Sequence, residues 1–273
     1  MTSKKLEPIG VEKTWGVASL PGQFAGIAEG MIGEIWFDPP ADDPLLVKYI
    51  FTSERLSIQV HPDDGQARAR GLSAGKEECW YIIGAEPDAV LGIGTRETLN
   101  EAELAEAARS GEIEALMQWH PVEPGMFFHI PAGTVHAIGA GVSLVEIQQN
   151  SDITYRLYDY GRPRELHLVD GAAVARARPM RASLQQLVDP AKSALLLRSS
   201  GLSVAHVIAA DPAPLERAAG GVMIVPLSGG VTTGGVSVGV GQCLWTDNPR
   251  DVEASANGRF LAGWKPAAGA GTR

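Results

Sequence analysis

Four residues in three stretches of the chain could together hold a metal ion. Gln59 and His61 stand two apart in a stretch where Leu56, Ile58 and Val60 alternate with polar residues, so both lie on the polar face of a predicted β-strand. Glu78 opens an adjacent predicted strand, and His136 follows a Pro-Gly turn on a returning strand. We expect the four side chains to converge inside a barrel. Two imidazoles, one carboxylate and one amide oxygen suit a borderline metal such as Zn²⁺.

The other metal-binding residue types do not form such a group. The chain has two cysteines, Cys79 and Cys243, which make neither a disulfide framework nor a Cys-x-x-Cys zinc site. A lone histidine on a strand is usually a core or surface residue, and we interpret the remaining four as structural: His120, His129, His167 and His206.

Short strand patterns separated by glycine and proline turns dominate the first part of the chain. The predicted strands are 31–38, 45–51, 55–61, 78–83, 90–93, 126–130, 134–138, 142–147 and 152–158. Between Asn100 and Met117 the composition changes to Ala, Glu and Leu at helical spacing. Asn100 and Glu103 match a capping box, and Gly111 divides this insertion into two predicted helices. Many short strands with glycine turns predict a mainly β jelly-roll barrel.

The chain divides into two predicted units. We expect residues 1–175 to form a first barrel with a helical insertion at about 98–118, and residues 176–265 to form a second, smaller β unit with Gly-Gly turns. A weak helix or connector is expected over 175–200, and a disordered tail over 266–273. Since the second unit contains only His206, we expect no metal site there.

Composition excludes several classes of function. The 273 residues are 45% hydrophobic and carry a formal net charge of −9, which argues against nonspecific binding to nucleic acid or to anionic membranes. The N-terminus lacks the apolar core of a signal peptide, and no stretch of 18 apolar residues is present. We therefore expect a cytoplasmic protein without membrane or nucleic-acid partners.

One local pattern resembles the second motif of the cupin superfamily. It is Gly125-x5-Pro131-x-Gly133-x2-His136, although Ala140 replaces the usual final Asn. The first cupin motif occurs in altered form, with Gln59-x-His61 in place of His-x-His and with Glu78 placed late.

Four segments are similar to the signature of type I mannose-6-phosphate isomerases, in particular to the short bacterial branch. They are Ser57–Asp63 (SIQVHPD), Lys76–Tyr81 (KEECWY), Pro131–Ala137 (PAGTVHA) and Ser151–Arg156 (SDITYR). The resemblance is dense from about Trp15 to Gly171 and weak thereafter.

The resemblance implies a cupin barrel, one zinc ion per chain and a hexose 6-phosphate substrate, in a monomer or homodimer. The implied zinc ligands are Gln59, His61, Glu78 and His136. The implied catalytic residues are Lys76, Glu146 and Arg156, and the implied substrate-binding residues are Lys48, Ser57 and Arg156. Arg162 and Arg164 could help to bind phosphate, and Glu34 is interpreted as structural. The alternative to a catalytic role for Glu146 is that it anchors His136 or Arg156.

The implied reaction is the reversible interconversion of mannose 6-phosphate and fructose 6-phosphate. A base moves a proton between C2 and C1 through a cis-enediol, whose oxygens need a cation or preorganised donors. Glu146, Lys76 and a hydroxide held by the metal remain candidates for the base. Two alternatives are a metal-dependent cupin oxygenase, against which Gln59 argues, and a non-catalytic cupin that binds a sugar phosphate.

Overall fold

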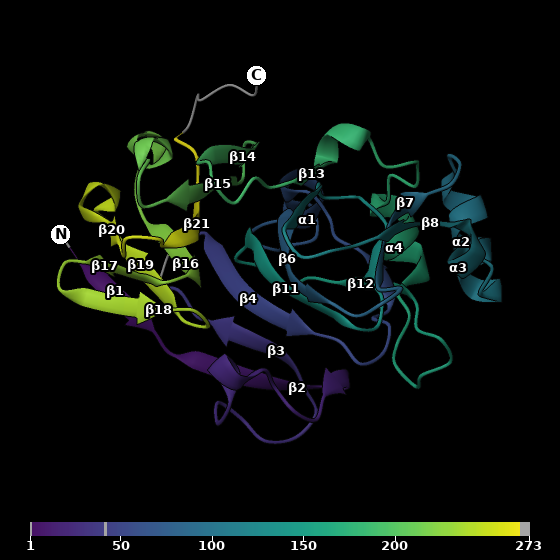
Figure 1. The fold of residues 1–273 in the computed structure, drawn as a ribbon. Coiled ribbons are helices and arrows are strands. Elements are labelled where there is room, and N and C mark those ends of the chain that lie inside the picture. Colours follow the sequence, from purple (N-terminus) through teal and green to yellow (C-terminus); the bar gives the residue numbers. More distant parts are fainter. Residues whose placement is uncertain (1, 41–42, 268–273) are drawn as a thin grey trace.

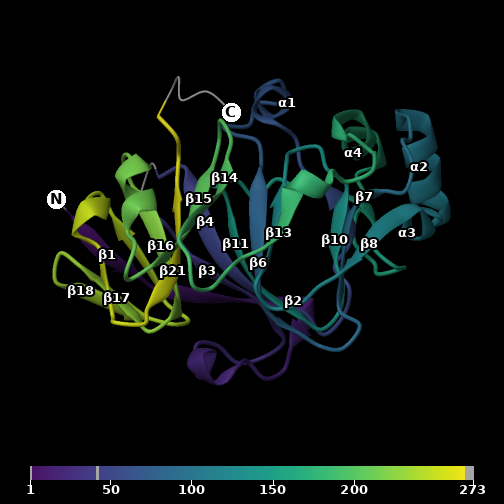
Figure 2. The same ribbon diagram turned by 45° about the horizontal axis from the view of Figure 1, so that its top comes forward.

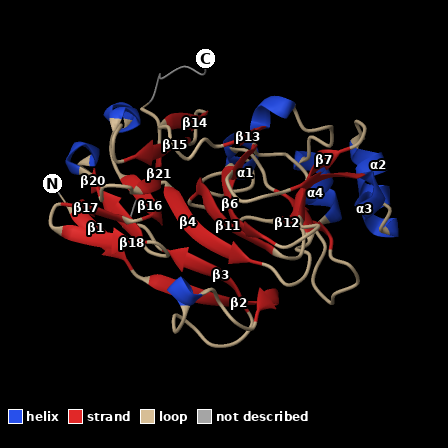
Figure 3. Cartoon of the chain, in the orientation of Figure 1, coloured by secondary structure: helices blue, strands red, loops and turns tan. Residues whose placement is uncertain are grey.

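A seven-stranded antiparallel sheet forms the centre of the molecule (Figures 1 and 3). The computed structural model describes residues 2–40 and 43–267. The strands of the central sheet are, in order, β13 (Gln185–Leu187), β9 (Met126–Ile130), β6 (Glu78–Ala85), β11 (Val142–Gln149), β4 (Leu45–Phe51), β3 (Ile32–Phe37) and β2 (Pro8–Val17).

A five-stranded sheet faces the central sheet and closes the first barrel. Its strands are, in order, β12 (Tyr155–Tyr158), β5 (Ile58–Val60), β10 (His136–Ile138), β7 (Val90–Thr95) and β8 (Met117–Pro121). The two sheets enclose a core in which Trp80, Ile82 and Phe128 of the central sheet pack with Leu91 and Ile93 of β7. This two-sheet arrangement confirms the predicted mainly β cupin barrel.

The other face of the central sheet packs on a six-stranded sheet. Its strands are, in order, β1 (Ser3–Leu6), β19 (Cys243–Thr246), β16 (Val222–Ser228), β21 (Arg259–Trp264), β15 (Ser203–Ile208) and β14 (Ala194–Arg198). Tyr49 and Ile147 of the central sheet share one buried cluster with Val204, Val225 and Leu261 of the six-stranded sheet. Because both faces of the central sheet are covered, every residue of β4 is buried and its sequence, LLVKYIF, is nearly all apolar.

A three-stranded sheet completes the second β unit. It consists of β18 (Val236–Gly239), β17 (Gly230–Thr233) and β20 (Glu253–Ala254), and a separate buried cluster fills the space between it and the six-stranded sheet. Figure 2 shows this unit at the end of the molecule opposite to the helices α2, α3 and α4.

Few helices are present. The α-helices are α1 (Asp64–Arg68), α2 (Glu101–Ser110), α3 (Ile113–Leu116) and α4 (Leu168–Val174), and the 3-10 turns are η1 (Gly22–Phe24), η2 (Ala182–Leu184), η3 (Ala213–Arg217) and η4 (Pro249–Asp251). None of the helices in the described part of the chain has the length and apolar character needed to span a membrane.

The predicted helical insertion is confirmed in detail. The side chain of Asn100 accepts a hydrogen bond from the backbone of Glu103, and the side chain of Glu103 accepts one from the backbone of Asn100. Gly111 ends α2 with a φ of 84°, a left-handed conformation that glycine adopts without strain. Leu104, Ala108 and Ile113 bury their side chains against the outer face of the five-stranded sheet.

A weak helix or a connector is expected over 175–200, and the structure has no α-helix in this stretch. The helix lies earlier, in α4, and residues 175–200 contain the strands β13 and β14 with a single 3-10 turn. The stretch has no period because each strand is short and pairs with a different sheet: β13 with β9, and β14 with β15.

Two strands cross the proposed domain boundary at residue 175. Strand β1 pairs with β19 of the second unit, and β13 pairs with β9 of the first. We keep the division into a catalytic barrel and a smaller C-terminal unit as a proposal. In this proposal β1 is assigned to the C-terminal unit and β13 to the catalytic barrel. Of the tail 266–273, Pro266 and Ala267 follow the last strand without regular structure, and residues 268–273 lie outside the described residues.

Candidate active site

Two rows of side chains in strand register build the site from opposite sheets. On the five-stranded sheet, Gln59 of β5 is the direct partner of His136 on β10 and of Arg156 on β12. On the central sheet, Glu146 of β11 is the direct partner of Trp80 on β6 and of Lys48 on β4. Cross-strand partners lie close enough for their side chains to touch, so each row is fixed by sheet pairing.

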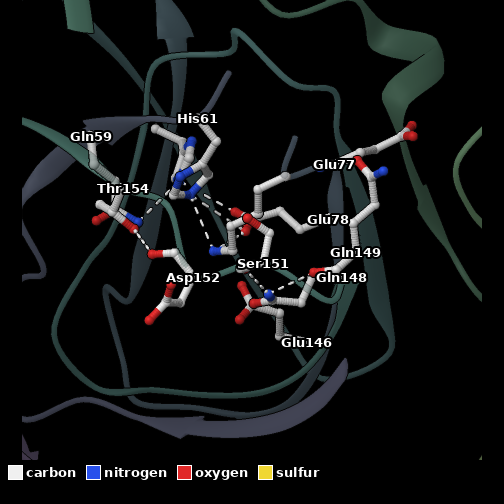
Figure 4. Close-up of polar contacts among 12 residues, drawn as sticks. Gln59, His61, Glu77, Glu78, Glu146, Gln148, Gln149, Ser151, Asp152 and Thr154 are labelled. Carbon is white, nitrogen blue, oxygen red and sulfur yellow. Dashed lines mark hydrogen bonds and ion pairs between the residues drawn. The ribbon is translucent and has the colours of Figure 1, made fainter. Parts of the chain in front are cut away.

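His61, Glu78 and His136 form a buried cluster between the sheets. Their candidate ligand atoms all lie within 4.8 Å of one another. Figure 4 shows His61 and Glu78 directed toward each other. The carboxylate of Glu78 is 3.6 Å from Nε2 of His61 and 3.3 Å from Nε2 of His136. Glu78 is fully buried, and the ammonium of Lys76 lies 2.7 Å from its Oε2. Two imidazoles and one carboxylate that converge in this way form a donor set that fits a metal ion such as zinc.

Backbone carbonyls orient both imidazoles toward this cluster. Nδ1 of His61 lies 2.7 Å from the carbonyl oxygen of Ile153, and Nδ1 of His136 lies 2.8 Å from that of Thr134. Because a carbonyl only accepts, each Nδ1 is the donor and each Nε2 carries a lone pair. Burial, with the nearby Lys76, lowers the pKa of His61, and burial lowers the pKa of His136 to about 4. Both rings are therefore neutral and prepared as metal ligands.

Gln59 presents its amide nitrogen to the cluster. Its Nε2 lies 3.2 Å from Nε2 of His136, while its Oε1 accepts a hydrogen bond of 3.3 Å from Ser57. A half-turn of the amide exchanges the two atoms and places the oxygen beside the histidine. The structure therefore brings together all four metal ligands implied by the sequence, three directly and Gln59 after this rotation.

The ammonium group of Lys76 enters the same cluster. It lies 2.7 Å from Glu78 and 3.2 Å from Nε2 of His61. Burial alone would lower the pKa of Lys76, but the charges of Glu146 and Glu78 outweigh it and raise the pKa. Burial raises the pKa of Glu78, and Lys76 opposes that rise. The ammonium of Lys76 therefore lies where the candidate ligand atoms converge, beside the carboxylate of Glu78.

Glu146 lies beside the cluster and carries a negative charge. Its Oε1 accepts a hydrogen bond of 2.9 Å from the indole of Trp80, and its Oε2 is 3.6 Å from Lys48. Burial opposes this charge, but Lys76 and Lys48 outweigh it and lower the pKa of Glu146. Burial lowers the pKa of Lys48, whose ammonium lies 4.3 Å from the ring centre of Trp36.

Arg156 reaches the pocket from β12. Its Nη1 donates to the carbonyl oxygen of Glu165 at 2.9 Å, and its buried Nε finds no partner among the described residues. Burial, followed by the charge of Arg164, lowers the pKa of Arg156. Arg164 is held by the buried carboxylate of Asp159 through two hydrogen bonds of 2.6 and 2.7 Å. Arg162 also binds Asp159 but does not line the pocket, whereas Arg164 does.

A pocket of about 340 Å³ opens beside the metal cluster. All the catalytic and substrate-binding residues implied by the sequence line it: Lys48, Ser57, Lys76, Glu146 and Arg156. The lining also includes residues that the sequence analysis did not assign to the site, among them Lys13, Trp15, Trp36, Trp80, Asp152 and Thr154. Trp80 could have been found, since it continues the alternation of Lys76 and Glu78 along one strand face.

Glu34 also borders this pocket, and its contacts fit the predicted structural role. Its carboxylate accepts a hydrogen bond of 2.6 Å from the indole of Trp36 and forms an ion pair with Lys13 at 3.4 Å. The remaining four histidines lie away from the cluster, as expected. Three contact backbone groups, namely His120, His167 and His206, and the fourth, His129, contacts Glu77.

The chain is similar in sequence to curated proteins and similar in fold to solved structures. No family model matches the chain. It is 48% identical over 132 residues to the mannose-6-phosphate isomerase ManA of Bacillus subtilis, covering 46% of this chain and 42% of the relative. It is 40% identical over 156 residues to the mannose-6-phosphate isomerase of Streptococcus mutans, covering 53% and 49%. A third relative, the probable mannose-6-phosphate isomerase GmuF of Bacillus subtilis, is 36% identical over 205 residues, covering 60% and 65%.

The resemblance to the type I mannose-6-phosphate isomerases is confirmed. The matches span about half to two thirds of the length of these relatives. The fold agrees over more of the chain: the crystal structure of the Bacillus subtilis mannose 6-phosphate isomerase matches with a TM-score of 0.77 at 24% identity, covering 96% of this chain and 99% of that one. A zinc-bound mannose 6-phosphate isomerase matches with a TM-score of 0.71 at 14% identity.

Proposed function

We propose that this chain binds one zinc ion and interconverts mannose 6-phosphate and fructose 6-phosphate. The observation that carries the proposal is the buried cluster of His61, Glu78 and His136 beside a pocket lined by Lys76 and Arg156. Relatives that match about half of the chain are named mannose-6-phosphate isomerase, which supports the same reaction. No observation in the structure favours an oxygenase or a non-catalytic binding protein over this reaction.

Zinc suits the donor set better than a hard cation does. Two neutral imidazoles and one carboxylate are typical of zinc, and the rotated amide of Gln59 would supply a fourth ligand. When bound, the metal would act as a Lewis acid toward substrate oxygens.

The positive side chains of the pocket would bind the substrate and stabilise the enediol. We assign Arg156 and Lys76 to the oxygens of C1 and C2, because both line the pocket and Lys76 remains charged in this arrangement. We assign Lys48 and Ser57, together with Arg156, to substrate binding. A phosphate bound away from the reacting carbons contributes binding energy that can be used in the transition state.

Glu146 is the group to which we assign the proton transfer between C2 and C1. Glu78 is committed to the metal, and Glu34 is engaged by Trp36 and Lys13. Glu146 remains as a buried carboxylate that lines the pocket, and the nearby Lys76 and Lys48 lower its pKa, which favours the ionised form that can accept a proton. It would receive the proton from C2 and return it to C1, while the hydroxyl proton on O2 is transferred to O1, so the atoms balance and the carboxylate is regenerated in each turnover.

The proposal is tested by incubating the zinc-loaded chain with mannose 6-phosphate and measuring fructose 6-phosphate. We expect turnover that chelation abolishes and added zinc restores, with far lower kcat/KM for mannose, which lacks the phosphate. A folded, zinc-loaded sample that binds mannose 6-phosphate without converting it would refute the isomerase and support a binding protein.

The expected cytoplasmic location and the expected monomer or homodimer stay predictions. So does the expected absence of a metal site in the C-terminal unit. Sedimentation of the native protein would test the oligomeric state, and metal analysis of the purified chain would test the number of metal sites.

A further inference from the structure

Glu77 lies between two residues of the site, Lys76 and Glu78, immediately before strand β6 begins at Glu78. Lys76 and Glu78 point into the metal cluster, and the alternation along an extended strand turns Glu77 to the other side. Figure 4 shows the side chain of Glu77 directed away from the cluster, toward Gln149. The side chain is only 13% exposed, so its charge must be matched by nearby groups.

Three separate elements hold Glu77 in place. Its Oε1 lies 2.6 Å from Nε2 of His129 on β9, and its Oε2 accepts a hydrogen bond of 2.8 Å from Ser199. Its backbone N–H donates to the side chain of Gln149 on β11, and its carbonyl accepts from the backbone N–H of Gln149, both at 2.9 Å.

Ser199 belongs to the C-terminal unit, in the turn between β14 and β15. The same hydroxyl oxygen accepts hydrogen bonds from the backbone N–H groups of Gly201 and Leu202, which shape the turn. Gly201 brings the turn against Glu77 so closely that a methyl group there would lie 2.9 Å from Oε2 of Glu77. The turn and the carboxylate are therefore in direct contact, with no room for a larger residue.

We infer that the C-terminal unit positions the metal-binding strand through this contact. The turn Ser199–Leu202 fixes Glu77, and Glu77 fixes the backbone from which Lys76 and Glu78 project into the site. Glu77 touches neither metal nor substrate, so it is a positioning residue. The inference rests on the proposed zinc site, and it gives the second β unit a part in the active site that lies in the first.

The test measures zinc affinity by competition with a chelator, together with the free energy of unfolding. Glu77→Gln removes the charge that His129 and Ser199 contact and leaves the turn intact, while Gly201→Ala pushes the turn away from Oε2. Gly239→Ala is the matched control: it lies in the same unit, no atom lies within 4 Å of the added methyl group, and its backbone is not left-handed.

We expect zinc affinity to fall roughly tenfold in Glu77→Gln and several-fold in Gly201→Ala, a typical effect of changing a residue that orients a metal ligand. Gly239→Ala should bind zinc as the unchanged chain does. Ser199→Ala should weaken zinc binding, and Ser199→Thr, which keeps the hydroxyl, should restore it.

Equal zinc affinities in Glu77→Gln, Gly201→Ala and Gly239→Ala would overturn the inference, even if the first two were less stable. This result is distinct from failure of the proposed function. A chain that binds zinc normally but does not convert mannose 6-phosphate would refute the reaction and leave the positioning role intact. A chain that binds no zinc would overturn both.

Discussion

The imidazoles of His61 and His136 are oriented by backbone carbonyls, not by acidic side chains. A carbonyl fixes the tautomer without adding negative charge, so Glu78 remains the single carboxylate among the candidate ligands. Zinc held by these groups would keep a net positive charge beside the pocket, which favours the charge that develops on the oxygens of an enediol.

Replacing one imidazole should separate metal binding from folding. We expect His136→Gln to lower zinc affinity by about 100-fold or more and to abolish turnover at limiting zinc, because one strong donor is lost. Chelator competition and the isomerase assay measure the two effects. His120→Gln is the control, since His120 contacts a backbone carbonyl away from the cluster. Equal zinc affinity in both variants would remove His136 from the metal site.

Arg156 should matter to the reaction and not to the metal. We expect Arg156→Lys to lower kcat by about 100-fold, because an ammonium cannot reproduce the planar, forked donors of a guanidinium. Zinc affinity should not change. Arg178→Lys, at an exposed arginine outside this pocket, is the control. An unchanged kcat in Arg156→Lys would exclude the assigned role of Arg156.

At the scale of elements, strand pairing places the site. The row of Trp80, Glu146 and Lys48 is fixed by the register of β6, β11 and β4, and it continues to Trp36 on β3. Because a shift of one residue would turn every side chain of a strand to the opposite face, the register is also what commits Glu146 and Lys48 to the pocket.

The helical insertion should contribute stability without contributing to the reaction. Asn100→Ala removes the side-chain oxygen that accepts the hydrogen bond from the backbone of Glu103, and it keeps the backbone N–H that donates to the side chain of Glu103. We therefore expect the free energy of unfolding to fall by about 1 kcal/mol. Activity per folded molecule should stay the same, since α2 packs on the outer face of the five-stranded sheet. Urea unfolding and the isomerase assay test this, and a parallel loss of kcat would contradict it.

Local sequence was enough to predict most strands of the first barrel, although not β2 and β8, and to predict residues that meet in the candidate site. The alternation around Gln59 and His61, the Pro-Gly turn before His136 and the capping box at Asn100 are all determined by neighbours within a few residues. The same local patterns predicted seven strands close to their observed bounds, whereas the strands predicted over 55–61 and 152–158 begin later, at Ile58 and Tyr155.

Contacts between distant segments could not be predicted in this way. Strands β1 and β13 are short, and each is stabilised by a partner in the other unit, β19 and β9. The contact of Ser199 with Glu77 joins residues 122 positions apart, and Ser199 belongs to none of the motifs found in the sequence. The pairing of Lys13 with Glu34 at the pocket likewise depends on the register of β2 and β3.

At the scale of the whole molecule, the central sheet belongs to both units. One face lines the barrel that contains the site, and the other packs on the six-stranded sheet through residues such as Tyr49 and Val225. The second unit therefore covers apolar surface that the catalytic barrel would otherwise expose to water, and burial of such surface is favourable by about 25 cal/mol per Å².

Zinc should stabilise the folded chain as a whole. Because the candidate ligands meet only in the folded state, zinc at about 100 times its dissociation constant should add about 2.7 kcal/mol to the free energy of unfolding. Unfolding in urea with zinc and after chelation measures the difference. His136→Gln should lose most of this zinc-dependent gain, and an equal gain in that variant would show that zinc acts elsewhere.

The most direct test of the account is a zinc titration of the chelated chain, followed by the rate at which mannose 6-phosphate becomes fructose 6-phosphate. The account predicts that the rate rises linearly with added zinc and stops rising at one zinc ion per chain. A rate that is independent of zinc, or a folded chain that takes up zinc and never converts the substrate, would contradict it.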